Sequence, residues 1–206
     1  MNRLPRLLVF TTDAICSAAD FPVRAAALAG LGTAVGLVVR MPLATAQEQA
    51  AVAERLAAVT RTGGARCFIH SQPDLARALS ADGVQLRSSD LSPADSRSFY
   101  PGWIGVSVHS REAAEAAVGE GADFLVAGNV FATASHPGRP PRGLAWLSEI
   151  CALGRPVYGI GGVTPALAAD LAGAGAWGSA VISAVWDARD PVVPARELSA
   201  AWSKSA

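Results

Sequence analysis

The feature that most constrains the fold of this chain is a pattern that repeats eight times. Short apolar runs rich in β-branched residues alternate with stretches rich in Ala, Leu, Glu and Arg, whose apolar residues recur at intervals of three and four. The first pattern is typical of buried strands and the second of amphipathic helices. Apolar strands that are each followed by a helix form parallel sheets covered by helices. The alternation therefore predicts an α/β fold.

The predicted strands are Leu7–Thr11, Gly36–Arg40, Ala65–His70, Gly83–Leu86, Trp103–Val108, Phe124–Gly128, Pro156–Ile160 and Ser179–Ser183. The longer predicted helices are Val23–Leu31, Ala46–Thr60, Arg111–Glu120, Leu144–Leu153, Pro165–Ala172 and Pro194–Ser203. Ser110 and Thr164 carry hydroxyl groups that can cap the helices after them. Eight units favour a closed sheet, so we expect residues 1–206 to form a single small (β/α)8 barrel.

An open, doubly wound sheet is the competing architecture. Its best support is Gly30-Leu31-Gly32 with Gly36 nearby, which resembles a dinucleotide-binding glycine motif. That motif has to follow a strand and open a helix, whereas this run leads into a strand and its third glycine is one residue late. We therefore favour the closed barrel.

Composition excludes several classes of function. Every apolar run is broken well before the roughly 18 residues that a membrane-spanning helix needs. Net charge is zero, like charges do not cluster and aromatic residues make up only 6% of the chain, so neither a membrane nor a nucleic acid is an expected partner. Only Lys204 is lysine, which argues against Schiff-base catalysis from a strand. Three cysteines without metal-ligand spacing, and no apolar signal segment, predict a cytoplasmic protein.

Two segments have the character of phosphate-binding loops. Gly161 and Gly162 follow the seventh predicted strand, and Ser183 and Ala184 lie where the eighth leads into the last helix. In (β/α)8 barrels the loops after these two strands commonly hold a phosphate through main-chain N–H groups. The alternative is that the glycines only make tight turns. Because both segments occur in these two positions, we predict that a small phosphorylated ligand is the partner.

All three histidines, His70, His109 and His136, fall just after predicted strands, at the end of the barrel where active sites lie. Imidazole groups there can act as acid or base near neutral pH. His136 belongs to an irregular stretch from Asn129 to Gly143, whose length suggests a lid or binding loop. Asp90 can ligate a metal or cap the helix that follows it.

The ordered motifs resemble those of the thiamine phosphate synthase and thiazole tautomerase superfamily. They include Leu8-Val9-Phe10-Thr11-Thr12-Asp13, Ile104-Gly105-Val106-Ser107-Val108-His109-Ser110 and Gly159-Ile160-Gly161-Gly162-Val163-Thr164. The resemblance covers nearly the whole chain. It implies a small (β/α)8 barrel that handles phosphorylated thiazoles. The synthases join a pyrimidine diphosphate to a thiazole phosphate with Mg²⁺ and release pyrophosphate, whereas the tautomerases shift a double bond without metal.

Several positions of this chain depart from the synthase motifs. Only Arg40 remains of a Gln-x-Arg-Glu-Lys motif, and His70-Ser71-Gln72 stands in place of Asn-Asp-Arg, which removes one of two magnesium-ligating aspartates. The resemblance implies that Asp90 is the other metal ligand and that Ser107 contacts pyrophosphate. His136 occupies the position of the lid lysine. With Thr133 of the same loop, Arg40, Ser107 and His136 are the predicted contacts to substrate or pyrophosphate.

The tautomerase branch resembles this chain more closely in detail, although it carries its catalytic histidine where this chain has Asn129. We therefore predict a metal-independent, tautomerase-like enzyme in which His70 has taken over the acid/base role, with Asn129 and His109 beside it. The first alternative is a thiamine phosphate synthase, which would need Mg²⁺. The second is a non-catalytic protein that binds a phosphate ligand. Trp186 and Trp202 indicate either a homodimer contact or packing against the barrel.

Overall fold

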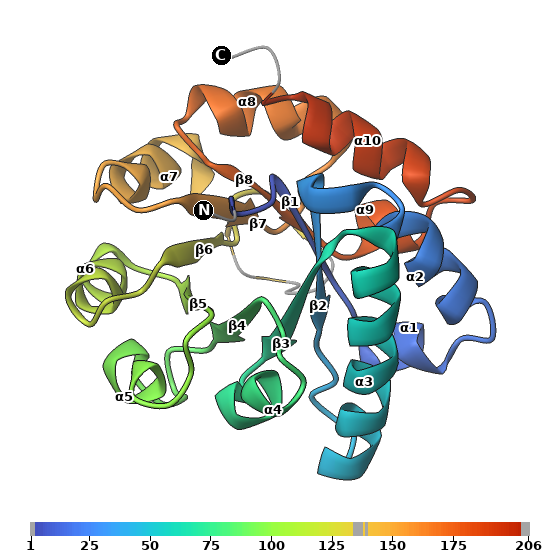
Figure 1. Ribbon diagram of the computed structural model, residues 1–206. Coiled ribbons are helices and arrows are strands. Elements are labelled where there is room, and N and C mark those ends of the chain that lie inside the picture. Colours follow the sequence, from blue (N-terminus) through green and yellow to red (C-terminus); the bar gives the residue numbers. More distant parts are fainter. Residues whose placement is uncertain (1–2, 134–137, 139, 203–206) are drawn as a thin grey trace.

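The computed structural model describes residues 3–133, 138 and 140–202. Within these residues, eight parallel strands follow one another around a closed barrel, and β8 pairs with β1 to complete it. Helices surround the barrel (Figure 1). The predicted (β/α)8 fold is confirmed. The open-sheet alternative is wrong, because the parallel pairing of Leu7 with Ser179 leaves no sheet edge there.

The strands are β1 (Leu7–Phe10), β2 (Val35–Val39), β3 (Arg66–His70), β4 (Gly83–Leu86), β5 (Trp103–Val108), β6 (Phe124–Gly128), β7 (Val157–Ile160) and β8 (Gly178–Val181). Each boundary lies within two residues of the predicted one. The largest difference is at the end of β8, where Ser183 is the first residue of a short helix and not the last of the strand.

The α-helices are α1 (Asp13–Ser17), α2 (Phe21–Ala29), α3 (Ala46–Gly63), α4 (Pro73–Ala78), α5 (Pro93–Arg97), α6 (Arg111–Gly119), α7 (Gly143–Cys151), α8 (Ala168–Gly173), α9 (Ser183–Trp186) and α10 (Val192–Ala200). Two 3₁₀ turns are present as well, η1 (Gly32–Ala34) before β2 and η2 (Pro165–Leu167) before α8. Ser110 caps α6 as predicted, by accepting a hydrogen bond from the Ala113 N–H. Thr164 makes no such bond, and the segment after it begins as a 3₁₀ turn.

Large side chains inside the barrel lie beside glycines of the neighbouring strand. The paired positions are Phe68 with Gly83, Phe124 with Gly105, and Tyr158 with Gly178. A Cβ atom on Gly105 would lie 2.1 Å from the Phe124 ring, so the aromatic side chain occupies the space that a larger neighbour would need. These aromatics and their apolar neighbours form an inner core, and a larger core lies between the strands and the helices.

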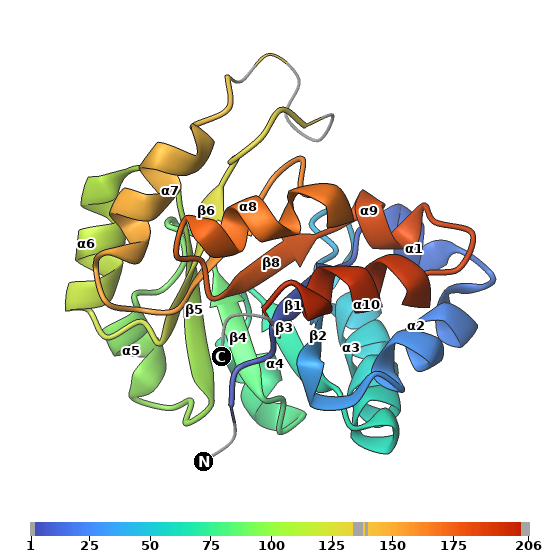
Figure 2. The same cartoon turned by 90° about the horizontal axis from the view of Figure 1, so that it is seen from above.

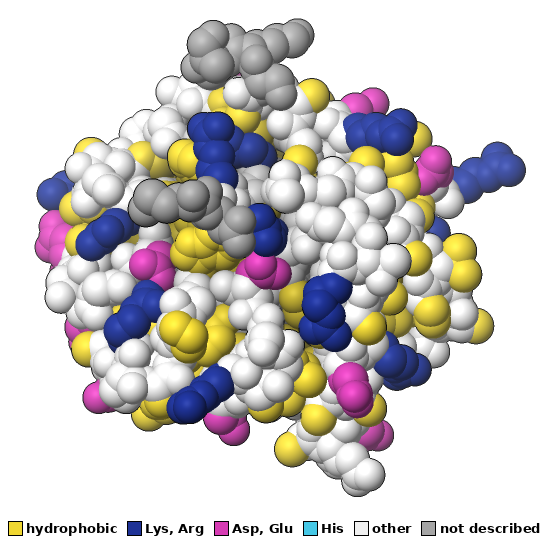
Figure 3. Space-filling model, viewed as in Figure 1, with side chains coloured by type: hydrophobic (Ala, Val, Ile, Leu, Met, Phe, Trp, Pro, Cys, Tyr) yellow, Lys and Arg dark blue, Asp and Glu magenta, His cyan; other side chains and the backbone are white. Residues whose placement is uncertain are grey.

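Trp186 and Trp202 are both buried within the single chain, each with 7% of its surface exposed. Their indole N–H groups donate to the carbonyl oxygens of Phe10 and Ala176. Packing against the barrel therefore accounts for both side chains, and neither supplies exposed apolar surface for a homodimer. On the face that Figure 3 shows, basic and acidic side chains are scattered. No helix among the described residues has the length and apolar character needed to cross a bilayer.

The direction of the strands decides where a site can form. All eight are parallel, so their carboxyl ends open at one end of the barrel. The chain leaves β6 at the end opposite the N-terminus, as Figure 2 shows. Loops at that end can differ in sequence with little effect on the barrel interior, because most core residues belong to the strands and helices.

Candidate active site

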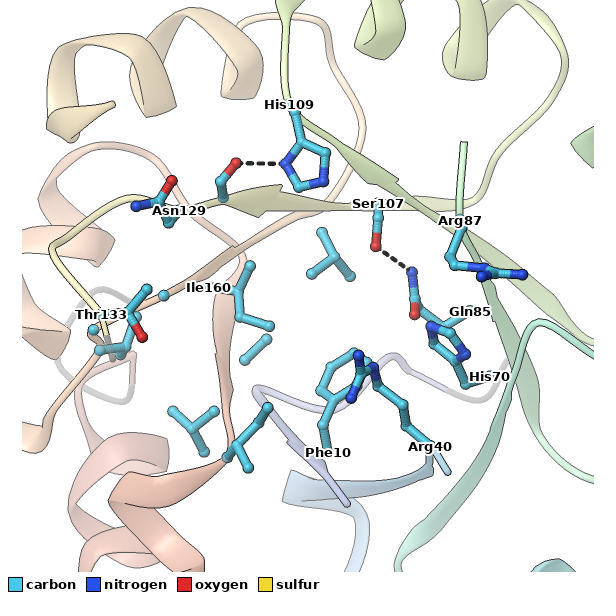
Figure 4. A pocket seen from close by; sticks show the side chains of 18 of the residues that line it. Phe10, Arg40, His70, Gln85, Arg87, Ser107, His109, Asn129, Thr133 and Ile160 are labelled. Atoms are coloured by element: carbon cyan, nitrogen blue, oxygen red, sulfur yellow. Dashed lines mark hydrogen bonds between the residues drawn. The ribbon is translucent and has the colours of Figure 1, made fainter. Parts of the chain in front are cut away.

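A cavity of about 510 Å³ lies at the carboxyl ends of the strands, where barrel active sites are found. Nearly all of the predicted site residues line it: Arg40, His70, Ser107, His109, Asn129, Thr133, Gly161, Gly162, Ser183 and Ala184. Asp90 is not among the residues that line this cavity. His136 lies outside the described residues. Figure 4 shows His70 and Arg40 on one side of the cavity, with Asn129 and Thr133 on the other.

The Gly161-Gly162 turn is held from outside by the segment after β6. The carbonyl oxygen of Ile160 accepts a hydrogen bond from Val130, at 2.8 Å, and that of Gly161 accepts one from Phe131, at 3.0 Å. In a trans peptide the N–H points away from the carbonyl of the same unit. The N–H groups of Gly161 and Gly162 therefore point away from the segment after β6. Both glycines line the cavity, so this orientation suits an anion bound there.

Ser183 and Ala184 line the cavity as the first residues of α9. N–H groups in the first turn of a helix have no partner within the helix. Their position one strand away from Gly161 and Gly162 follows from the pairing of β7 with β8. Two adjacent turns can thus present main-chain donors to one anionic group.

His109 is oriented by a main-chain bond. Its Nδ1 lies 2.7 Å from the carbonyl oxygen of Gly128, at the end of β6 (Figure 4). A carbonyl oxygen only accepts, so Nδ1 carries the proton and Nε2 of the neutral ring keeps its lone pair. Asn129 follows Gly128 and is largely buried, with its amide donating to the Phe131 carbonyl oxygen at 3.4 Å. An amide does not exchange a proton near neutral pH, so the imidazoles are the acid/base candidates here.

His70 ends β3, and its Nδ1 lies 3.0 Å from the hydroxyl oxygen of Ser71. The pKa of His70 is lowered to about 4, chiefly by burial and then by the positive charge of Arg40, while Asp90 opposes the effect. The ring is therefore neutral at pH 7. It can bind a ligand through hydrogen bonds, and the lowered pKa makes it a weaker base than an ordinary histidine.

We expect this burial to make stability depend on pH. The unfolded chain binds a proton at His70 below its ordinary pKa of 6.5, whereas the folded chain does so only near 4. The free energy of unfolding should thus fall by up to about 3 kcal/mol as the pH drops from 6.5 to 4. Above pH 6.5 the contribution of His70 should not change with pH. Urea titrations of the wild type and His70→Asn at several pH values measure it. Parallel pH profiles for the two proteins would contradict the prediction.

Arg40 brings an uncompensated positive charge to the cavity. Its main chain is fixed by Thr11, whose hydroxyl accepts from the Arg40 N–H at 2.9 Å. Its guanidinium group has no hydrogen-bond or ion-pair partner among the described residues, although the side chain is half-buried. Burial accordingly lowers the pKa of Arg40, with Asp13 opposing and Arg87 reinforcing the effect. A partly desolvated cation without a partner is stabilised when an anion binds beside it.

Asp90 is engaged by Arg87. One carboxylate oxygen accepts from Arg87 Nε at 3.0 Å and Nη2 at 2.8 Å, and the other accepts from the Arg87 main-chain N–H at 2.7 Å. Burial raises the pKa of Asp90, but the hydrogen bonds from Arg87 and Ser71 outweigh it and the net pKa lies below the ordinary value. The helix-cap alternative is wrong, because Ser92 caps α5.

The described residues do not fit a Mg²⁺ site. Mg²⁺ prefers an octahedral shell of oxygen ligands, to which proteins commonly contribute one or two carboxylates beside substrate phosphates and waters. Both oxygens of Asp90 already accept hydrogen bonds from a guanidinium or main-chain donor. No cluster of three or more His, Cys, Asp or Glu side chains that could hold a metal occurs among residues 3–133, 138 and 140–202. The prediction of Asp90 as a metal ligand therefore finds no supporting partner there.

Sequence reasoning missed several polar residues of the cavity, and two of them, Gln85 and Arg87, make hydrogen bonds to other site residues. Gln85 donates to the Ser107 hydroxyl oxygen at 2.7 Å, which leaves the Ser107 proton free to donate elsewhere. A signal for Arg87 was present, because an arginine three residues before an aspartate can pair with it in a turn after a strand. Neither residue belongs to a motif that points to chemistry by itself.

The chain is similar to several known proteins along most of its length. Residues 7–185 match the thiamine monophosphate synthase family. A thiamine-phosphate synthase of Thermus thermophilus is 42% identical over 152 residues, which cover 72% of this chain and 73% of the relative. One from Roseiflexus castenholzii is 44% identical over 158 residues, covering 74% and 69%. The solved thiamine phosphate pyrophosphorylase of Pyrococcus furiosus superposes with a TM-score of 0.83 at 34% identity, covering 98% of this chain and 97% of that one.

Proposed function

Because this chain belongs to the thiamine monophosphate synthase family, we propose that it joins a pyrimidine diphosphate to a thiazole phosphate and releases pyrophosphate. This is the alternative and not the main prediction from the sequence. The relatives reported above favour it, since they are named as synthases or pyrophosphorylases and not as tautomerases. The observation that carries it is a single cavity in which the Gly161-Gly162 turn, the first turn of α9 and an unpaired arginine meet.

The two ends of the cavity suit the two substrates. Gly161, Gly162, Ser183 and Ala184 offer main-chain donors for the phosphate of the thiazole. Arg40 and the free proton of Ser107 lie where a second anionic group can bind. In the joining reaction a bond forms between the thiazole ring and the carbon that carries the diphosphate, the bond from that carbon to the diphosphate oxygen breaks, and its electron pair leaves with that oxygen. Arg40 then stabilises the charge that develops on the leaving group.

The metal-independent, tautomerase-like reaction is the second candidate. It is favoured by one observation, namely that two imidazoles, His70 and His109, line the cavity together with the turns proposed to bind phosphate. In that reaction an imidazole removes a proton from the ring and returns it at another position. A protein that binds the phosphate ligand without chemistry is the third candidate, and the same experiment separates all three.

The experiment mixes the purified protein with the pyrimidine diphosphate and the thiazole phosphate, and measures released pyrophosphate and the joined product by mass spectrometry. We expect equal amounts of both. Arg40→Ala should lower the rate by about 100-fold, because one charge-assisted contact in the transition state contributes about 3 kcal/mol. Arg155→Ala, which changes an arginine that does not line the cavity, is the control.

Two outcomes would overturn the synthase proposal. If no pyrophosphate appears at high protein concentration but the double bond of a thiazole carboxylate phosphate shifts, the second candidate is correct. A His70→Asn or His109→Asn variant then identifies the imidazole that moves the proton. If neither reaction occurs and calorimetry detects bound thiazole phosphate, the chain is a binding protein.

A further inference from the structure

The charge of the cavity is unusual for a site that is expected to use a metal. Among the described residues that line it, two are arginines, two are histidines and none is a carboxylate. A divalent cation would meet only positive or neutral groups there. An anion with several charges would instead find cations already in place.

Arg87 supplies the second of these cations. It follows β4 directly and lies at the edge of the cavity on the same side as His70 (Figure 4). Asp90, which is only 8% exposed, holds the guanidinium group through Nε and Nη2, while 59% of the Arg87 side chain surface is exposed. Nη1 has no hydrogen-bond partner among the described residues. The carboxylate thus orients the guanidinium group and leaves donors for a ligand.

We propose that the guanidinium groups of Arg87 and Arg40 bind a diphosphate directly, so that this site needs no divalent cation. The inference rests on the proposed function, in which one substrate carries a diphosphate. Asp90 then acts as a positioning residue that fixes Arg87, instead of as a ligand to a metal. Guanidinium groups suit this role because their planar forks match phosphate oxygens and they stay charged at any physiological pH.

The hydrogen-bond donors that remain available in the cavity support direct binding of a diphosphate. Arg40 has its whole guanidinium group available, Arg87 adds its Nη1 amino group, and Ser107 adds a hydroxyl proton, since Gln85 already donates to its oxygen. These donors come from the ends of β2, β4 and β5, which are held by the barrel. The ligand therefore meets a site whose main chain is fixed before binding, which limits the entropy lost on binding.

The test is calorimetric titration of the protein with inorganic pyrophosphate, once in EDTA and once with Mg²⁺. We expect the Kd in EDTA to lie within about threefold of the Kd of the uncomplexed pyrophosphate measured with Mg²⁺. Arg87→Ala should raise the Kd in EDTA about tenfold or more, since a hydrogen bond to a charged group is lost. Arg111→Ala is the matched control, because Arg111 is also an exposed arginine paired with a nearby acid and does not line the cavity.

Three results would overturn the inference: binding that requires Mg²⁺, no binding of pyrophosphate in either buffer, or an unchanged Kd for Arg87→Ala in EDTA. Arg87→Lys keeps the charge without the fork and should fall between the wild type and Arg87→Ala. Circular dichroism checks that each variant is folded. Titration with thiazole phosphate separates this inference from the proposed function, because that ligand tests the turns at Gly161-Gly162 and Ser183-Ala184. If thiazole phosphate binds and pyrophosphate needs Mg²⁺, only the inference fails.

Discussion

Replacing Gly162 with alanine is expected to weaken binding of thiazole phosphate about 100-fold, because the N–H donors of the turn are displaced. A Cβ atom at this position would lie 2.2 Å from the carbonyl oxygen of Ala132 and 2.9 Å from Cβ of Phe131. Both contacts are far shorter than van der Waals distance, and one of them is to main chain. The turn must therefore move away from the segment after β6 that holds it. Calorimetry with thiazole phosphate measures the change in Kd.

Gly162 also has a φ of +66°, which costs an alanine about 1 kcal/mol whatever the space around it. Gly121→Ala is the control for this part, because Gly121 has a φ of +89° and no atom within 4 Å of the position of its Cβ. It precedes β6, at the end of the barrel away from the cavity. We expect Gly121→Ala to lower stability slightly and to bind thiazole phosphate like the wild type. Unchanged binding by Gly162→Ala would show that the turn does not hold the phosphate.

The barrel could be predicted from the sequence because its signal is local and repeated. Each strand is an apolar run bounded by turn residues, and β4, β5 and β6 begin and end at the predicted residues. The short helices α1 and α9 were not predicted, since five and four residues are too few to show a helical period. The end of β8 was misplaced for the same reason, because Ser183 and Ala184 continue an apolar run while forming the first turn of α9.

The turns at Gly161-Gly162 and Ser183-Ala184 could be predicted from their order in the chain, since the place of a turn in this fold follows from the strand before it. The role of Asp90 could not be predicted in this way. The sequence places one carboxylate in the loop after β4, which equally suits a metal ligand or a helix cap. Only the folded turn brings Arg87 back onto Asp90 with three hydrogen bonds. The spacing of three residues permits this pairing, but whether it forms depends on the main-chain angles of the loop.

The packing of aromatic side chains against glycines inside the barrel could not be predicted from the sequence either, because it depends on the register between strands. Phe124 pairs with Gly105 only when β5 and β6 are aligned as they are here. The Phe124 ring lies edge-on to Phe68, with ring centres 5.8 Å apart, and to Tyr158, at 5.5 Å. A shift by one residue would place a side chain where the ring lies. The glycine thus fixes the register as much as the aromatic does.

Phe124→Ala is expected to lower the free energy of unfolding by about 3–5 kcal/mol, because the ring is fully buried and its neighbours cannot close the space it leaves. For a chain of this length, the melting temperature should fall by about 10 °C. Phe99→Ala is the control, since Phe99 is only partly buried and packs against the outer core, so its loss should cost clearly less. Urea and thermal unfolding measure both.

A double-mutant cycle tests the reason for the loss. Gly105→Ala alone should be strongly destabilising, because its Cβ would lie 2.1 Å from two atoms of the Phe124 ring. In the Phe124→Ala background the ring is absent, so the Cβ atom of Ala at position 105 meets no overlap and fills part of the cavity. The double variant should therefore be more stable than the sum of the two losses predicts, by about 2 kcal/mol. Additive losses would mean that the two positions do not share this space. Since β5 and β6 also carry Ser107, His109 and Asn129 to the cavity, a coupling at this pair would tie the barrel core to the geometry of the site.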